Sequence, residues 1–262
     1  MNIVVCIKRV PDTGETQVNI AEDGLGIKRD KLVYDINEAD NYALEEALLI
    51  RAKQGGSVTV VTVGDEASNE QLRTCMAKGA DAAVRFFDSR LTALDGYATA
   101  KILHALLKPL APDMVLTGCV SSDVAAGQVG VQLAQMLHFA HATLVTKVDV
   151  GDSSAKVRSE LENGLAMMLE LKLPALIAVQ TGINEPRYAS FRGIKEAYKR
   201  EIKVVDLAVL SLDMDELANS IAQVKLEKLF VPKSDKTAQV LSGSAEETAA
   251  QLAKILVDKG LV

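Results

Sequence analysis

The sequence contains no tryptophan, and only 4% of its 262 residues are aromatic. Its hydrophobic fraction of 48% is nevertheless ordinary for a folded globular protein. The core must therefore be built mainly from alanine, valine, leucine and isoleucine. A chain of this length is long enough for one large α/β domain, or for such a domain with an additional arm.

Cysteine and histidine are also scarce, with three of each. Cys6, Cys75 and Cys119 are far apart, form no C-x-x-C pair and have no metal-ligand spacing. Each lies in or beside an apolar run, which indicates buried and unreactive thiols. The histidines form no H-x-x-x-H pair, and the sequence therefore predicts no metal site.

Long apolar runs are missing as well. No run approaches the roughly 18 apolar residues that a membrane span needs. The apolar segment within residues 1–8 is too short for a signal peptide and lacks a basic leader. We expect a soluble, cytoplasmic protein without stable membrane insertion. The net charge of −6 argues against a general nucleic-acid-binding protein.

No constellation of residues indicates covalent catalysis. The chain has neither a Ser-His-Asp order nor a nucleophile elbow. The acidic pairs Asp12 with Glu15 and Glu45 with Glu46 are interpreted as solvated surface charge. These absences favour a carrier or binding role over an enzyme.

Strand-like and helical segments alternate through the first half of the chain. The predicted strands cover 3–7, 58–63, 82–87 and 113–117, and the predicted helices cover 42–54, the segment around Leu72 to Met76, 97–107 and about 127–137. Such alternation predicts a parallel sheet with right-handed crossovers and helices on both faces. Asn37 with Asp40 is interpreted as a loose capping box for the first helix, and Asp95 as the cap of the third.

From about residue 143 the pattern changes to short strands joined by turns. Segments 143–150, 156–161 and 166–171 predict an antiparallel hairpin excursion, with an Asn-Gly hairpin signal before the last of them. Residues 174–180 return to a buried strand. The expected fold class is therefore α/β: a mostly parallel twisted sheet with helices on both faces, an antiparallel hairpin excursion and a C-terminal arm.

We predict an α/β nucleotide-binding domain over residues 1–203 and a C-terminal arm over 204–262. Within the arm, 207–221 mixes apolar and acidic residues and 230–233 is expected to be extended. Ser244 and Glu247 form a capping-box pattern before a last helix. The pattern leaves two alternatives open, because the arm either wraps around a partner subunit or folds back on its own domain.

One candidate ligand site lies after the predicted strand 113–117. Ligands of open α/β sheets bind outside the carboxyl ends of the strands. Here the strand leads into a loop of small residues, 120–127, that opens onto a helix. Backbone N–H groups and the dipole at such a helix start hold phosphates. The loop matches neither G-x-G-x-x-G nor a Walker loop, and a plain strand–helix turn is the alternative.

A second candidate site is the stretch 182–195, which follows the apolar run 175–179. It begins with turn residues and places Tyr188 and Phe191 among basic side chains. The pattern predicts a surface loop with a hydrophobic tip and a cationic base, which suits docking to a protein. The alternative is a connecting loop whose two aromatic residues pack inward.

The run N-E-P-R-Y-A-S-F over residues 184–191 resembles the signature region of electron-transfer flavoprotein β subunits, where a short basic helix follows. The resemblance extends over nearly the whole chain and includes 4–12, 37–47, 73–81, 113–118 and 184–195. It implies an electron-carrier subunit, not an enzyme, in a heterodimer whose α subunit chiefly holds the FAD and receives the arm 204–262. Phe191 replaces the family's usual Leu as the anchor for a transiently bound flavoprotein dehydrogenase. The partner-binding residues by this resemblance are Tyr188, Phe191, Arg192, Ile194 and Lys195, within a recognition loop over 182–200.

The resemblance also implies a buried nucleotide, which is AMP in ordinary members and a second FAD in electron-bifurcating members. Carried over by position, its pocket uses Cys6, Asn37, Glu38, Ala39, Asp40, Val63, Asp123, Val124, Ala125, Ala126, Gly127, Gln128, Val129, Gly130 and Val131. Bifurcating members resemble D-G-D-T-A-Q-V-G-P here, whereas this chain reads D-V-A-A-G-Q-V-G-V. The difference favours AMP. The alternatives are a bifurcating β subunit that oxidises NADH and a stand-alone adenine-nucleotide-binding module.

Overall fold

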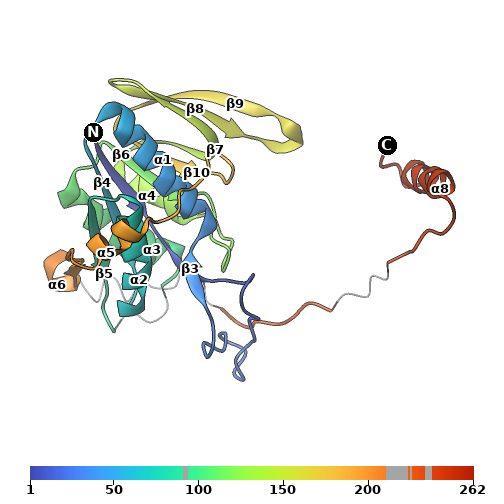
Figure 1. Cartoon of the computed structure of the whole chain (residues 1–262), viewed down its shortest axis with the longest axis horizontal. Helices are drawn as coiled ribbons and strands as arrows, with labels where there is room; N and C mark the ends of the chain where they lie inside the picture. Colours follow the sequence, from blue (N-terminus) through green and yellow to red (C-terminus); the bar gives the residue numbers. More distant parts are fainter. Residues whose placement is uncertain (91–93, 211–223, 225, 234–237) are drawn as a thin grey trace.

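The computed structural model describes residues 1–90, 94–210, 224, 226–233 and 238–262. Within these residues the largest sheet has nine strands, in the order β11-β5-β4-β1-β6-β10-β7-β8-β9 (Figure 1). Its strands are β1 (Asn2–Cys6), β4 (Ser57–Val63), β5 (Ala82–Phe86), β6 (Met114–Gly118), β7 (Ala140–Val150), β8 (Ser154–Glu160), β9 (Ala166–Lys172), β10 (Ala175–Val179) and β11 (Lys203–Val205). Two further strands, β2 (Arg9–Pro11) and β3 (Tyr34–Ile36), pair antiparallel beside it.

The helices lie between these strands and in the C-terminal segment. They are α1 (Glu38–Gln54), α2 (Asn69–Lys78), α3 (Gly96–Leu107), α4 (Val129–Leu137), α5 (Phe191–Ala197), α6 (Leu207–Leu210) and α8 (Ala245–Asp258). Short 3-10 turns lie at Glu66–Ser68, Lys108–Leu110 and Glu162–Gly164. In the described part of the chain, no helix combines the length and the apolar composition needed to cross a membrane.

The predicted fold class is confirmed. Strand β1 pairs in parallel with β4 and β6, and β6 pairs in parallel with β10. Strand β7 extends the sheet in parallel beside β10, and β8 and β9 follow antiparallel. The predicted hairpin excursion is thus part of the same sheet, because β7 pairs with β10 along one side and with β8 along the other.

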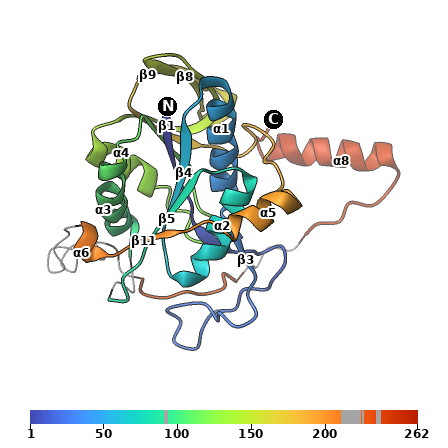
Figure 2. The ribbon, with the colours of Figure 1, turned by 60° about the vertical axis from the view of Figure 1, so that its left-hand side comes forward.

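Two hydrophobic clusters cover the two faces of the sheet. Alternate residues of a strand point to opposite faces, so Ile3 and Val5 pack with residues of α1 and α2, whereas Val4 and Cys6 pack with residues of α3 and α4. Figure 2 shows α1, α2 and α5 on one side of the strands and α3 and α4 on the other. Both faces are buried, which explains why the parallel strands read as continuous apolar runs.

The helix starts test the capping predictions. The Asp95 side chain accepts a hydrogen bond from Ala98 N at 2.8 Å, as predicted for α3. Both bonds of the Ser244 and Glu247 capping box are present in α8. The predicted capping box at α1 is wrong, because the Asn37 side chain makes no capping bond there.

The C-terminal segment begins in the α/β body, where Val205 of β11 and Leu207 of α6 are buried, and its described residues 238–262 extend away from the sheet. Figure 1 shows α8 lying apart from the α/β body, and none of its residues is buried. The segment touches the body where Leu229 N donates to Gly24 O at 2.7 Å. Residues 230–233 are exposed and belong to no helix or strand, while 211–221 of the predicted arm lie outside the described residues.

Candidate functional site

The first candidate site lies at the carboxyl ends of three neighbouring strands. Because β4, β1 and β6 run in parallel, Val63, Cys6 and Gly118 reach the same edge of the sheet. The first turn of α1 and the start of α4 meet them there. The structure thus brings together the segments that the sequence pointed to for nucleotide binding.

Asp40 ties two of these strand ends together. Its carboxylate accepts hydrogen bonds from Lys8 N at 2.8 Å and from Gly118 N at 2.9 Å. Burial raises the pKa of Asp40 to about 6, and the Lys8 N–H opposes this rise by favouring the carboxylate. Asp40 therefore links the ends of β1 and β6 by accepting hydrogen bonds from both. Its carboxylate oxygens bond mainly to the protein's own backbone.

Asn37 has a similar role toward the loop after β6. Its side-chain amide donates to Val120 O at 2.9 Å, and its side-chain oxygen accepts from Ser122 N at 3.1 Å. These contacts explain why the capping box predicted for α1 does not form. Asn37 and Asp40 bond to neighbouring segments and not to the helix backbone around them.

Lys8 brings a positive charge to the same loop. Its ammonium donates to Asp123 Oδ1 at 2.7 Å and to Ser121 Oγ at 3.2 Å. The Lys8 side chain is 45% exposed, and an exposed pair of this kind contributes about 0–1 kcal/mol to stability. The pair matters more for ligand binding than for stability, because it places a positive charge beside the loop that leads to the N-terminus of α4.

The start of α4 offers unsatisfied backbone donors. Gln128 precedes the helix without a side-chain capping bond, and the first turn carries no acidic residue. Gln132 N, which bonds to Gln128 O at 3.1 Å, opens the hydrogen-bond ladder of the helix. The preceding N–H groups, those of Val129 to Val131, have no partner in a helical ladder. Such a helix start attracts anions, phosphate groups in particular.

Thr117, at the end of β6, adds a buried hydroxyl. Its Oγ1 is among the buried side-chain atoms of the described chain that lack a hydrogen-bond partner. A Cβ on Gly130 would lie 2.8 Å from this oxygen, so the hydroxyl lies directly against the first turn of α4. In the loop between them, Gly127 and Ala125 have left-handed φ angles of 60° and 54°. The loop therefore curves back on itself before the helix begins.

The predicted nucleotide-site residues differ in their exposure to solvent. Cys6 and Ala39 are buried and Val63 is half-buried, whereas Glu38 is exposed. Burial, and then the charge of Asp40, raises the Cys6 pKa far above its ordinary value, so this thiol forms an apolar wall. The loop and helix-start residues are exposed or half-buried: Asp123, Val124, Ala125, Ala126, Gly127, Gln128, Val129, Gly130 and Val131.

The thiols follow the sequence prediction at two of three positions. Cys6 and Cys75 are buried, as predicted. Cys119 is only half-buried, which corrects the prediction, because it begins the loop after β6 and lies outside the sheet. Its Sγ donates to Gln180 Oε1 at 3.2 Å. Among the described residues, no group of three or more Cys, His, Asp and Glu side chains is placed to hold a metal ion.

The second candidate site is the stretch 182–195. Tyr188 is 96% exposed and Phe191 is 87% exposed, so the alternative in which both pack inward is wrong. Phe191 is the first residue of α5, and the Ser190 side chain caps this helix by accepting from Gly193 N at 3.0 Å. The remaining predicted partner-binding residues are also exposed, namely Arg192, Ile194 and Lys195.

Sequence reasoning missed two buried carboxylates beneath this stretch. Glu45 and Glu46 were interpreted as solvated surface charge, but only 5% and 8% of their surfaces are exposed. Glu45 binds the Arg187 guanidinium, and Glu46 accepts from the Asn184 side chain at 3.0 Å. The available signal was their position on a helix between the apolar residues of 43–48, where a buried charge requires a partner.

The chain is similar to known proteins over nearly its whole length. The family description "Electron transfer flavoprotein domain" matches residues 24–210. The electron transfer flavoprotein subunit beta of Methylophilus methylotrophus is 36% identical over 260 residues, 98% of each chain. The subunit of the same name from Bacillus subtilis is 35% identical over 259 residues, 98% of this chain and 97% of the relative.

The chain belongs to the electron transfer flavoprotein family. Its full-length similarity is to proteins named beta subunits, which places its function in electron transfer as a carrier. A third electron transfer flavoprotein relative is the caffeyl-CoA reductase-Etf complex subunit CarD of Acetobacterium woodii. It is 32% identical over 265 residues and 100% of each chain.

Proposed function

We propose that this chain is the β subunit of a heterodimeric electron-transfer flavoprotein that takes electrons from a flavoprotein dehydrogenase and passes them to an acceptor. The observation that carries the proposal is end-to-end similarity to proteins named beta subunits. The α subunit of the heterodimer chiefly holds the FAD. This flavin supplies the redox chemistry, and the protein sets its surroundings and its partners.

In this proposal the β subunit binds AMP at the carboxyl ends of β1, β4 and β6. The uncapped start of α4 supports it, because the N–H groups of Val129 to Val131 and the Lys8 ammonium suit a phosphate. The buried, unpartnered Thr117 hydroxyl beside Gly130 also fits a polar ligand. Cys6 and Val63 would line apolar walls. A bound nucleotide stabilises the native state by mass action.

The proposed dehydrogenase-docking site is the exposed tip formed by Tyr188 and Phe191, with Arg192 and Lys195 beside it. Exposed aromatic side chains supply large contact areas at protein interfaces, and neighbouring cations steer an acidic partner. Phe191 is the central anchor, with Ile194 one turn further along α5. Docking through this small tip allows transient association, as electron carriers need.

The proposed role of the arm, 204–262, is to pack on the α subunit. Its described part supports this role because α8 leaves the apolar side chains of Leu252 and Val257 about half exposed, at 49% and 61%. An amphipathic helix that buries no residue against its own domain needs another surface to cover it.

A second candidate function is that of an electron-bifurcating β subunit, which binds a second FAD in place of AMP and oxidises NADH. Two observations favour keeping it. The chain retains Gln128-Val129-Gly130 at the start of α4, and it is similar to a subunit of the caffeyl-CoA reductase-Etf complex over its full length. Departures from the bifurcating pattern at 124–127 and Val131 favour AMP.

One experiment separates these functions. The chain is purified together with its α subunit, the complex is denatured, and the released nucleotides are identified by chromatography. One FAD and one AMP per heterodimer support the simple carrier. Two FAD and no AMP contradict AMP binding and make bifurcation the leading function. Failure to form any heterodimer overturns the β-subunit proposal itself.

A further inference from the structure

The exposed tip of the proposed docking site has little packing of its own. Tyr188 and Phe191 are both almost fully exposed, so contacts of their own side chains do not set where they lie. Their positions depend on how the backbone on either side is held. The residues just before Tyr188 are held by carboxylates of α1, and α5 is held by backbone contacts with other elements.

We propose that Glu45 and Arg187 form a positioning pair for partner docking: their ion pair fixes the backbone before Tyr188 on α1 and so holds Tyr188 in one orientation beside the Phe191 anchor. The inference rests on the docking function proposed above. Neither residue is proposed to touch the partner dehydrogenase. Both act through Tyr188.

The geometry of the pair is that of a clamp. Arg187 Nε donates to Glu45 Oε2 and Nη2 donates to Oε1, each at 2.8 Å. The backbone N–H of Arg187 also donates to Oε2, at 3.1 Å. A two-pronged Arg–carboxylate contact restricts orientation as well as distance. The third bond extends this restriction to the main chain, directly before Tyr188.

Burial makes this pair different from an ordinary surface ion pair. The Glu45 side chain is 7% exposed, whereas that of Arg187 is 42% exposed. Burial alone would raise the pKa of Glu45, but the Arg187 bonds outweigh it and hold the pKa below its ordinary value. Glu45 therefore stays charged at neutral pH, and Arg187 is the partner that satisfies it.

A second contact on α1 supports the same backbone from its beginning. Asn184 Nδ2 donates to Glu46 Oε2 at 3.0 Å and to Tyr42 O at 3.1 Å. The segment 184–187 is thus attached to α1 at both of its ends. The three residues 188–190 then span from this attachment to the start of α5.

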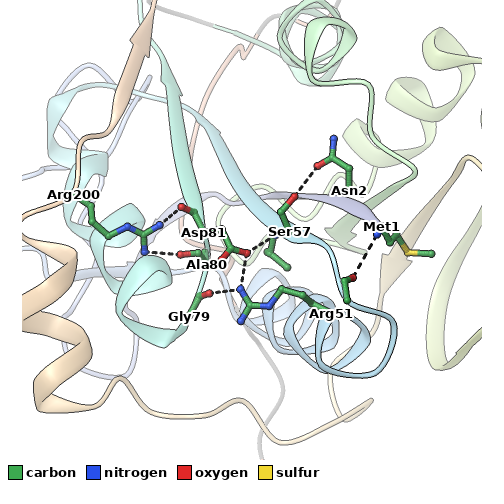
Figure 3. A network of polar contacts seen from close by, with 10 residues as sticks. Met1, Asn2, Arg51, Ser57, Gly79, Ala80, Asp81 and Arg200 are labelled. Carbon is green, nitrogen blue, oxygen red and sulfur yellow. Dashed lines mark hydrogen bonds and ion pairs between the residues drawn. The ribbon is translucent and has the colours of Figure 1, made fainter.

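The far side of the tip is held independently of Glu45. A Cβ on Gly193 would lie 2.3 Å from Ala77 O, so α5 lies directly on the end of α2. Arg73 Nη1 donates to Ala197 O at 2.8 Å. Beyond α5, the Arg200 guanidinium donates to Ala80 O at 2.8 Å and to Asp81 O (Figure 3).

The turn that receives Arg200 is itself fixed. Asp81 Oδ2 accepts from Arg51 Nη1 at 2.5 Å, and Arg51 Nη1 also donates to Gly79 O (Figure 3). Asp81 Oδ2 accepts a further hydrogen bond from Val58 N at 2.8 Å. These bonds join the turn to α1 and β4. Loss of the Glu45 clamp would therefore free residues 187–189, which include Tyr188, while leaving α5 and its cap Ser190 in place. Docking would then have to order this freed backbone, which weakens association.

The test uses the purified heterodimer with its dehydrogenase and compares Glu45→Gln with wild type. Gln preserves the side-chain size but turns an amide group toward the Arg187 donors. We expect KM for the heterodimer in the dehydrogenase reaction to rise about tenfold, with kcat and bound nucleotide little changed. Arg187→Lys, which keeps the charge and loses the planar fork, should raise KM by a smaller factor.

Further variants make the outcome specific. Glu160→Gln removes one negative charge from an exposed pair with Arg158 on β8, outside the 182–200 loop, and should leave KM near wild type. Phe191→Ala removes the anchor and should raise KM. The double variant Glu45→Gln with Tyr188→Ala should be little worse than Tyr188→Ala alone, because the positioning pair acts through Tyr188.

The possible failures are distinguishable. A KM for both Glu45→Gln and Arg187→Lys equal to that of wild type, with Phe191→Ala impaired, overturns the positioning role and leaves docking intact. Fully additive effects in the double variant also overturn it. An unimpaired Phe191→Ala overturns the docking function and the inference with it. Should Glu45→Gln yield no folded heterodimer, Arg187→Lys decides alone, since the Arg187 side chain is 42% exposed and Lys keeps its charge.

Discussion

Gly118 is the position where a single added methyl group should disturb the candidate nucleotide site most. A Cβ there would lie 2.4 Å from Asp40 Oδ1, 2.8 Å from Ala39 Cβ and 2.9 Å from Asp40 N. All three atoms belong to the first turn of α1, so relieving the contact requires that turn to move. Overpacking of this kind costs about 1–3 kcal/mol, and weakening a hydrogen bond to a buried charge about 1.5–3 kcal/mol. We expect Gly118→Ala to lower the free energy of unfolding by about 3 kcal/mol.

Thermal unfolding of the purified protein measures this effect. A loss of about 3 kcal/mol corresponds to a fall in Tm of roughly 6–12 °C for a chain of this size. Nucleotide retained after gel filtration should fall as well, because the displaced turn carries Asp40. Gly26→Ala is the matched control, since a Cβ there meets no atom within 4 Å. A Gly118→Ala protein that melts within about 2 °C of wild type would refute the argument that α1 is rigidly seated on β6.

Three other predictions follow from single residues. Burial raises the pKa of Asp40 from 3.8 to about 6, so the native state binds more protons than the unfolded state between these two pH values. The resulting stabilisation is fully present below about pH 4 and is lost as pH rises through about 6. The free energy of unfolding should fall by about 3 kcal/mol over this range. Asp40→Asn should remove that slope from a series of unfolding curves at pH 4–7, and parallel pH profiles would contradict it. Ser244→Ala should destabilise α8 by about 1 kcal/mol, measured as faster amide exchange in that helix, and unchanged protection would count against the cap. A maleimide should label Cys119 in the native protein, because this thiol is only half-buried. Cys6 and Cys75 are buried, and burial raises the pKa of Cys75 to about 12, so the reagent should reach both only after unfolding. Labelling of Cys75 in the native protein would be inconsistent with its burial.

The sheet and its helices were largely predictable because their signals are local. Parallel strands buried on both faces require uninterrupted apolar runs, and β1, β4 and β6 carry them. The caps at Asp95 and Ser244 also depend only on residues three positions apart, and both formed as predicted. Exposure of Tyr188 and Phe191 agreed with the interpretation of 182–195 as a surface stretch.

The capping prediction failed where a side chain could bond either to its own helix or to a segment distant in the sequence. Asn37 and Asp40 carry a capping pattern, yet they bond to Val120, Ser122, Lys8 and Gly118. No sequence pattern states that the ends of β1 and β6 will present unpaired N–H groups to the start of α1. The choice depends on which backbone groups need acceptors once the strands have paired.

By itself, the sequence determined most of the alternating strands and helices, the family and the exposure of the stretch 182–195, since hydrophobic periodicity and short motifs depend on residues close together in the chain. Only the tertiary structure decided which charges are structural. Glu45 and Arg187 are 142 residues apart, and nothing near either of them indicates the other. Folding buries Glu45 on α1, and a buried carboxylate must find a donor, so the ion pair is a consequence of packing and not of local sequence.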